Sequence, residues 1–109
     1  QQPEGYWTRS LLDPEHAPGP ETSGTAFFTY GLLWGMNNGF LDKATYQPVV
    51  EKAWKYLTTV ALQPDGRIGY VQPIGEKAIP GQVVDANSTA NFGVGAFLLA
   101  ACEMVRFLN

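Results

Sequence analysis

The sequence predicts an all-α chain in which inner helices alternate with an outer one. Residues 21–39 and about 88–105 are apolar around nearly the whole helix circumference, whereas residues 46–62 between them are amphipathic. Only 16% of the 109 residues are charged, which leaves little solvated surface for so short a chain. A helix that is apolar all round must be covered by neighbours, and an amphipathic helix turns one face to water. We therefore expect the order buried, amphipathic, buried.

The first helix carries its own start and stop signals. Glu21, Thr22 and Ser23 can satisfy or complement the free N–H groups of a first turn, and the helix ends at residues 37–39, Asn-Asn-Gly. Three glycines interrupt its interior, and each costs about 1 kcal/mol relative to alanine. We expect these glycines to mark places where neighbouring backbones come close. They are Gly24, Gly31 and Gly35.

The second helix is predicted over residues 46–62, where apolar residues recur at the 3.6-residue spacing of one helix face. Polar residues hold the opposite face, so this helix is expected to lie on the outside. Trp54 belongs to its apolar stripe, and we expect both Trp54 and Trp34 to lie in the core. The polar residues are Glu51, Lys52 and Lys55.

The connection to the third helix begins with a strong turn signal, Gln-Pro-Asp-Gly at residues 63–66. Residues 67–72 then alternate well enough to predict a short strand or extended arm. A loop containing glycines and prolines runs to about Asp85. We expect Asn87 or Ser88 to cap the third helix.

An internal repeat supports an arrangement of helical hairpins. QPEG at residues 2–5 recurs as QPDG at residues 63–66, and ExxxTAxF at residues 21–28 recurs as DxxxTAxF at residues 85–92. The two offsets are about 61 and 64 residues. Two matches in the same order at nearly the same offset indicate a repeated unit of turn, extended arm, acidic residue and inner helix.

A repeat of inner and outer helices is typical of an α/α solenoid or a closed α/α barrel, in which each hairpin buries its inner helix against neighbouring hairpins. Fewer than two full hairpins cannot close such a ring. We therefore expect residues 1–109 to be a single, incomplete segment of such a domain. Its apolar helix faces would meet the remainder of the barrel or a second copy. The alternative is a compact three-helix domain with a few large apolar patches.

Composition argues against two classes of partner. The net charge is −3 and no run of Lys or Arg occurs, so nucleic acid is not an expected partner. The longest apolar run, residues 92–102, is shorter than the roughly 20 residues that span a bilayer, so no membrane span is expected. Cys102 is the only cysteine, and we expect it to be a buried structural thiol.

Two stretches of the chain are fairly specific in combination: ETSGTA at residues 21–26 and GVGAFLLA at residues 93–100. Together with the rest of the chain they resemble the C-terminal part of glycoside hydrolase family 105, the unsaturated rhamnogalacturonyl hydrolases, and of the related family 88. The resemblance covers essentially the whole chain. Its other matching stretches are GYW at residues 5–7, LD at 12–13, the helix from Tyr46 to Leu57, DG at 65–66 and VQPIG at 71–75.

The resemblance implies an (α/α)6 barrel, of which this chain is about the last third. Members of these families are hydrolases that release a terminal 4,5-unsaturated uronic acid from pectin-derived oligosaccharides such as rhamnogalacturonan fragments. An aspartic acid donates a proton to the C4–C5 double bond of the vinyl ether and activates water for attack at C5. The chemistry implies no metal and no organic cofactor.

The resemblance transfers no catalytic residue to this chain. In these families the aspartate, and the Arg and Trp that help to hold the uronate, lie upstream of the region matched here. We therefore expect this polypeptide alone to be inactive. The sequence does not encode a localisation, and of the compartments we expect the bacterial cytoplasm or periplasm for the parent protein.

Four residues are candidates for contact with a sugar substrate. Glu21 begins an inner helix, and the N-termini of inner helices can point into the pocket of such a barrel, although the carboxylate could instead complement the helix dipole. Thr22 and Ser23 could bond the sugar or cap the helix. Trp7 lies in a loop, where it could stack on a sugar ring. Asp85 is the weaker repeat counterpart of Glu21.

His16 is the only histidine and lies in a loop beside Asp13 and Glu15. A lone loop histidine is more often solvated than catalytic, so we expect it to face water. In an independent hydrolase it could pair with Asp13 or Glu15 as acid and base. No second histidine or cysteine is available for metal ligation.

Two other functions remain open at this point. One is a segment of a different (α/α)6 carbohydrate enzyme, such as a glucoamylase-like hydrolase or a sugar epimerase, because a fold does not fix a function. The other is a non-enzymatic helical repeat module that binds a protein partner through its apolar faces.

Overall fold

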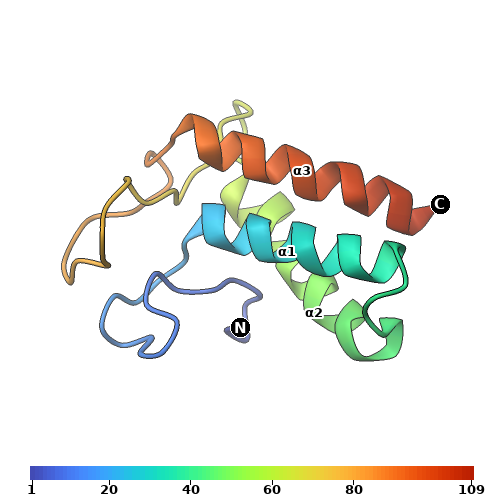
Figure 1. The fold of residues 1–109 in the computed structure, drawn as a ribbon. Coiled ribbons are helices and arrows are strands. Elements are labelled where there is room, and N and C mark those ends of the chain that lie inside the picture. The colour runs from blue at the N-terminus through green and yellow to red at the C-terminus, as the bar shows by residue number, and fades with distance from the viewer.

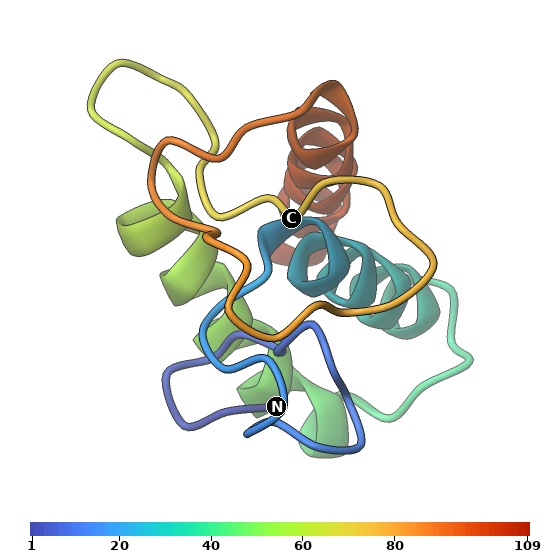
Figure 2. The same cartoon turned by 90° about the vertical axis from the view of Figure 1, so that its left-hand side faces the viewer.

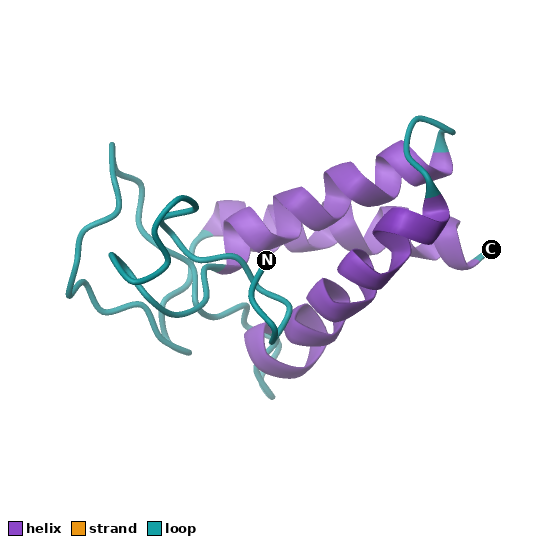
Figure 3. Cartoon of the chain, turned by 90° about the horizontal axis from the view of Figure 1, so that it is seen from below, coloured by secondary structure: helices purple, strands orange, loops and turns teal.

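The computed structural model describes residues 1–109 and contains three α-helices (Figure 1). They are α1 (Thr22–Asn37), α2 (Lys43–Tyr56) and α3 (Asn91–Leu108), and a π-helical turn, η1 (Leu57–Ala61), continues α2. All other residues form loops, turns and a single bridge (Figure 3). The all-α class and the positions of the first two helices are therefore confirmed.

Of the two forms predicted for residues 67–72, a short strand or an extended arm, the structure shows the extended arm. Only one antiparallel bridge forms, between Leu62 and Ile68. Successive N–H groups of this segment bond to unrelated parts of the chain, Gly69 to the Ala61 carbonyl at 2.8 Å and Tyr70 to the Asp85 carbonyl at 2.8 Å. The segment is an extended arm whose partners are too scattered to make a ladder.

Helices α1 and α3 lie side by side and begin at the same end of the molecule, while α2 crosses behind α1 in this view (Figure 1) and also packs on α3. The loop-forming segments before α1 and before α3 gather at that end (Figure 2). This loop-bearing end, defined by residues 1–21 and 62–90, is the part of the fold that can form a site.

The core divides into two buried clusters along α1. One surrounds Ala26 and Tyr56, and the other surrounds Leu33 and Val50. Trp54 is half-buried, contacts both clusters and stacks on Phe97 with ring centroids 5.7 Å apart, as expected of a core residue.

The prediction that Trp34 lies in the core is wrong for this chain. Its side chain is 43% exposed and stacks flat on the exposed ring of Phe40, with ring centroids 5.5 Å apart. Trp34 belongs to neither of the two core clusters.

Both inner helices leave an apolar face uncovered within these residues. Phe27 and Phe28 of α1 are exposed, as are Leu98, Leu99 and Val105 of α3. The sequence predicts this surplus of apolar surface, and the structure confirms that the chain does not bury it by itself. What covers it stays a prediction.

Cys102 is exposed, which overturns its prediction as a buried thiol. It lies on the face of α3 that also presents Leu98 and Leu99, where these side chains line a shallow apolar groove with Phe27. The apolar residues of α3 that do pack into the core are Ala96, which also borders this groove, Ala100 and Met104.

By length and composition alone, α3 is long and apolar enough to cross a membrane. The same is true of core helices of globular proteins, and α3 packs along α1. Its Glu103 is buried and accepts a hydrogen bond from the Asn37 side chain at 2.8 Å. We interpret α3 as a core helix.

Helix α3 begins at Asn91, later than predicted, and its N-cap residue Ala90 makes no side-chain cap. Asn87 and Ser88, the residues expected to cap α3, form hydrogen bonds with Asp85 and not with the helix. The Asp85 carboxylate accepts from the Asn87 N–H at 2.9 Å, and the Ser88 hydroxyl accepts from the Asp85 N–H at 3.0 Å. These bonds close a turn of their own, so the capping residues were correctly identified as turn formers but wrongly placed at a helix start.

The turns of the internal repeat are confirmed, although only the first acidic residue, Glu21, begins a helix. In the first turn, the Gly5 N–H donates to the Gln2 carbonyl at 2.9 Å, and in the second the Gly66 N–H donates to the Gln63 carbonyl at 2.9 Å. Both glycines have positive φ, 104° and 89°, a conformation that favours glycine.

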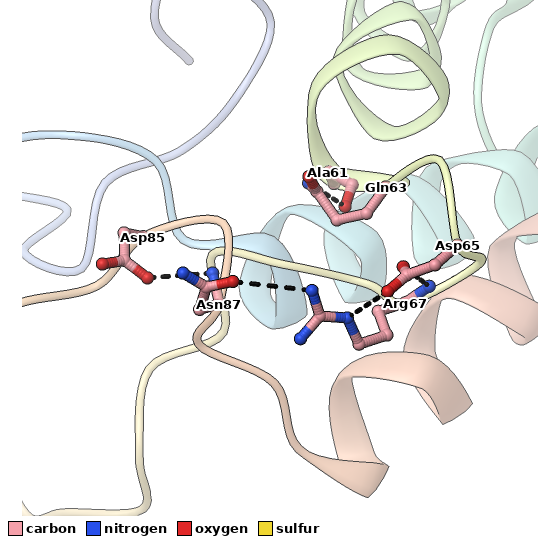
Figure 4. A network of polar contacts seen from close by, with 6 residues as sticks. All are labelled: Ala61, Gln63, Asp65, Arg67, Asp85 and Asn87. Carbon is pink, nitrogen blue, oxygen red and sulfur yellow. Dashed lines mark hydrogen bonds and ion pairs between the residues drawn. The ribbon is translucent and has the colours of Figure 1, made fainter.

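The second turn is tied to the turn before α3 by a polar network (Figure 4). The Arg67 side chain donates to Asp65 at 2.7 Å and to the Asn87 side chain at 3.5 Å. The Arg67 N–H, with its guanidinium, holds the pKa of Asp65 below its usual value. Because Arg67 and Asp65 are more than half exposed, this network adds little to stability.

The interior glycines of α1 behave differently from one another. A side chain at Gly35 would overlap Leu41, so this glycine does mark a close approach, although of a side chain rather than a backbone. Nothing lies near Gly31 within these residues. None of the three glycines has a neighbouring backbone as its nearest contact, so the expectation that they mark close approaches of backbones is wrong.

A buried chain of hydroxyl groups joins α1, α2 and the extended arm. The Thr22 hydroxyl lies 2.7 Å from the Tyr56 hydroxyl and donates to the Gly69 carbonyl at 2.7 Å. Since Thr22 has one hydroxyl proton, Tyr56 is the donor to Thr22. Burial raises the pKa of Tyr56 well above its ordinary value of 10.0, and the charge of Glu21 adds to the rise.

We predict that Tyr56→Phe lowers the free energy of unfolding by about 1–2 kcal/mol at neutral pH, because it removes one buried hydrogen bond and keeps the ring. The raised pKa means that Tyr56 stabilises the fold fully below pH 10.0 and loses this contribution as the pH rises further. The variant should therefore lose less stability above that pH than the parent. Urea unfolding of the whole protein measures both effects.

Tyr46→Phe is the matched control for this change, since its half-buried hydroxyl makes no hydrogen bond within the chain. It should leave the urea midpoint nearly unchanged. An equal loss in both variants would contradict the role given to the Tyr56 hydroxyl.

Candidate functional site

The loop-bearing end contains two adjoining cavities. The larger, of about 340 Å³, lies between the first turns of α1 and α3 and the loop of residues 73–82, and Ser23 and Phe92 contribute to its wall. The smaller, of about 150 Å³, is lined by Trp7 and Glu21. Arg9 and Gln72 line both cavities.

The Glu21 carboxylate holds this end together. It is the N-cap of α1 and accepts from the Gly24 N–H at 2.7 Å and from the Ser23 N–H at 3.2 Å. It also accepts from the Ser23 hydroxyl at 2.6 Å and from the Gln72 N–H, far away in the sequence, at 2.9 Å. The side chain is only 2% exposed and forms no ion pair. Four donors and the positive end of α1 therefore compensate its charge.

Thr22 and Ser23 have different surroundings although they are neighbours. Thr22 is fully buried, and its hydroxyl is bonded to Tyr56 and to the arm at Gly69. Ser23 reaches the wall of the larger cavity, and its hydroxyl oxygen keeps acceptor capacity after donating to Glu21. Of the two, only Ser23 is placed where a ligand could reach it.

Trp7 is half-buried at the rim of the smaller cavity. Its ring packs edge-on against Phe28, with centroids 5.1 Å apart. The backbone N–H of Trp7 donates to the Thr25 hydroxyl at 2.9 Å, and its backbone carbonyl accepts from the Glu21 N–H at 3.1 Å. The backbone of Trp7 is therefore fixed to the start of α1.

The other sequence candidates do not join this site. Asp85 closes the turn before α3, and His16, Asp13 and Glu15 are exposed in the loop before α1. No side-chain hydrogen bond joins His16 to either acid, which agrees with the expectation that it is solvated. No three His, Cys, Asp or Glu side chains gather as a metal site would require.

No motif in the sequence identifies Arg9, Gln72 or the loop of residues 73–82 as site residues. Arg9 and Gln72 carry no motif, and only the fold brings them together from segments about 63 positions apart. The one available signal was VQPIG at residues 71–75, which identifies the segment without giving it a role.

Comparison with known proteins gives the chain its family. Residues 1–108 match Glycosyl Hydrolase Family 88. The chain belongs to this family. It is 46% identical over 106 residues to the unsaturated 3S-rhamnoglycuronyl hydrolase of Formosa agariphila, an alignment that covers 97% of this chain and 27% of that protein. The family 88 chain therefore spans about a quarter of the length of this curated relative.

Solved structures agree with the family assignment. A family 88 glycosyl hydrolase from Bacteroides vulgatus is 78% identical with a TM-score of 0.92, over 98% of this chain and 31% of that one. A structure named as a polysaccharide lyase is 89% identical with a TM-score of 0.92, over 99% of this chain and 30% of that one. A possible family 105 member from Salmonella enterica, at 23% identity and a TM-score of 0.84, covers 100% of this chain and 28% of that one, and shows the fold alone.

These structures confirm the predicted architecture. The neighbours are (α/α)6 barrels, and the three helices of the family 88 chain form part of such a barrel. The resemblance to family 88 is likewise confirmed, and the family 105 structure shares the fold. Among the functions left open by the sequence, the match favours a carbohydrate-active enzyme over a protein-binding repeat module.

We predict that Glu21→Gln lowers the free energy of unfolding of the whole protein by about 2 kcal/mol. An amide nitrogen in place of one carboxylate oxygen would face N–H donors, and the remaining bonds would lose their charge. Glu4→Gln, at an exposed position, is the matched control and should change stability by less than about 0.5 kcal/mol. Equal effects of the two variants in urea unfolding would show that the buried carboxylate is not structural.

Proposed function

We propose that this segment forms one wall of the sugar-binding cleft of a hydrolase that removes a terminal 4,5-unsaturated uronic acid from an acidic oligosaccharide. The observation that carries the proposal is the 46% identity to an unsaturated 3S-rhamnoglycuronyl hydrolase across 97% of the chain. The resemblance found in the sequence implies pectin-derived substrates, and the relative's name implies a rhamnose- and uronate-containing one. Both share the terminal unsaturated ring.

In this proposal the segment binds and positions the substrate, and the acid–base carboxyl group lies elsewhere in the protein. Protonation of the C4–C5 double bond and addition of water at C5 convert the vinyl ether to a hemiketal, which opens and releases the next sugar. The cavity walls hold the oligosaccharide so that this ring meets the acid.

The four candidate residues divide into two roles. Ser23 and Trp7 contact the sugar, because they reach the two cavities with a free acceptor and an aromatic edge. Glu21 and Thr22 do not contact the sugar but position the residues that do, since both are buried and their polar groups are already hydrogen-bonded within the chain.

A second candidate activity is β-elimination by a polysaccharide lyase. It is favoured by the solved structure named as a polysaccharide lyase, which is 89% identical to this chain. A lyase breaks the C4–O bond of a uronate and creates a C4–C5 double bond. A hydrolase of the proposed kind consumes that bond.

The sign of one absorbance change therefore separates the two activities. We predict that the whole protein containing this segment lowers the ultraviolet absorbance of an unsaturated uronyl disaccharide as the double bond is hydrated. It should leave a saturated acidic polysaccharide unchanged. A rise in absorbance with the polysaccharide would establish the lyase instead, and no change with either substrate would contradict both.

A further inference from the structure

Arg9 is the cation at the centre of the loop-bearing end, and its present partners are weak. Its guanidinium donates to the Ile79 carbonyl at 3.4 Å, to the Gln82 side-chain oxygen at 3.2 Å and to the Gln82 carbonyl at 3.3 Å. All three acceptors are neutral. Bonds from a guanidinium to a carboxylate are typically about 2.7–2.9 Å long.

Arg9 forms no ion pair, and the Glu21 carboxylate that lines the smaller cavity with it is already bonded to four other donors. The chain has two ion pairs, Arg67 with Asp65 and Arg106 with Glu103, and neither involves Arg9. Its Nε group makes no hydrogen bond, and five N–H donors serve only three long contacts. Arg9 is half-buried beside two cavities, and its guanidinium has N–H groups left to donate to a bidentate acceptor.

The groups around Arg9 suit a sugar that bears one negative charge. Gln72 shares both cavities with Arg9 and makes no side-chain hydrogen bond, so its amide can both donate to and accept from hydroxyl groups. Ser23 adds an acceptor. The charged groups of the larger cavity besides Arg9 are Lys77 and Glu76, both exposed in its loop wall, and their charges cancel.

We propose that Arg9 is the residue of this cavity that recognises an anionic substituent, a carboxylate or a sulfate ester, on the sugar next to the unsaturated uronyl residue. The proposal rests on the proposed function for its choice of sugar. Carboxylates and sulfate esters present the same pair of oxygens to a guanidinium, so Arg9 accepts either source. Gln72 and Ser23 orient the hydroxyl groups of that sugar.

Arg9 also links the binding event to the loop. Residues 73–84 make one hydrogen bond among themselves, from the Gln82 N–H to the Ile79 carbonyl, and no others to the rest of the chain except those that Arg9 donates. A purely structural Arg9 would thus be a latch for the loop. If Arg9 only holds the loop, Arg9→Gln should weaken the binding of charged and neutral sugars alike. If Arg9 binds the anion, the variant should weaken the binding of charged sugars alone.

The test uses the whole protein and disaccharides with the same unsaturated uronyl residue. The second sugar is a uronic acid, the same sugar with its carboxyl group reduced to an alcohol, or a sulfated sugar. We predict that Arg9→Gln raises KM for the charged disaccharides by about 10- to 100-fold, with little change in kcat and little change for the reduced one. A larger effect on the carboxylate or on the sulfate ester identifies the natural source of the charge.

Calorimetric titration with a saturated acidic disaccharide, and with its carboxyl-reduced form, tests the same site without turnover. If the unsaturated substrates are not consumed, the proposed function fails, but a loss of charge preference in Arg9→Gln still supports the anion site. Equal binding of charged and reduced sugars by the parent protein overturns the site even if hydrolysis proceeds.

Two further variants separate recognition from structure. Gln82→Ala removes a neutral partner of Arg9 and keeps the guanidinium, so the preference for charged sugars should persist. Arg67→Gln removes an exposed arginine outside both cavities and should leave KM unchanged. If Arg9→Gln and Gln82→Ala weaken the binding of charged and reduced sugars equally, Arg9 only holds the loop in place and the proposal is wrong.

Discussion

The rest of the structure depends on the buried carboxylate of Glu21. Removing a carboxylate from water is costly unless its oxygens are bonded, and here four donors replace the water. Three of the donors belong to the first turn of α1. The fourth, the Gln72 N–H, belongs to an arm about 50 positions later, so one side chain fixes where that arm crosses the helix.

This crossing determines where the cavities form. Because Gln72 is held against the start of α1, residues 73–84 must leave the body of the molecule at that point and return at Asp85, which accepts from the Tyr70 N–H. The loop so formed encloses the larger cavity between α1 and α3, and Arg9 reaches it from the segment before α1. The placement of Ser23, Gln72 and Arg9 is therefore a consequence of one capping interaction and its long-range bond.

The features of the fold that could be predicted are those that local sequence patterns encode. Start and stop signals predicted the bounds of α1 closely, periodicity predicted the helical stretch formed by α2 and η1, and the repeat identified two turns with the same hydrogen bonds. Prediction from the sequence failed where competing local hydrogen bonds or partners distant in the sequence determine the structure. Ser88 and Asp85 satisfied each other rather than a helix, and Arg9 had no motif to mark it. Cys102 and Trp34 look like core residues by composition, but the segment has too few helices to cover them.

Amide hydrogen exchange, followed by mass spectrometry on the whole protein, tests the central role of Glu21 most directly. The account predicts that Glu21→Gln accelerates exchange together in peptides covering residues 22–26 and 68–72, because the same carboxylate holds both. Peptides from the second half of α3 should be unaffected. If the arm keeps its protection while only the first turn of α1 loses it, the carboxylate does not join them and the account is contradicted.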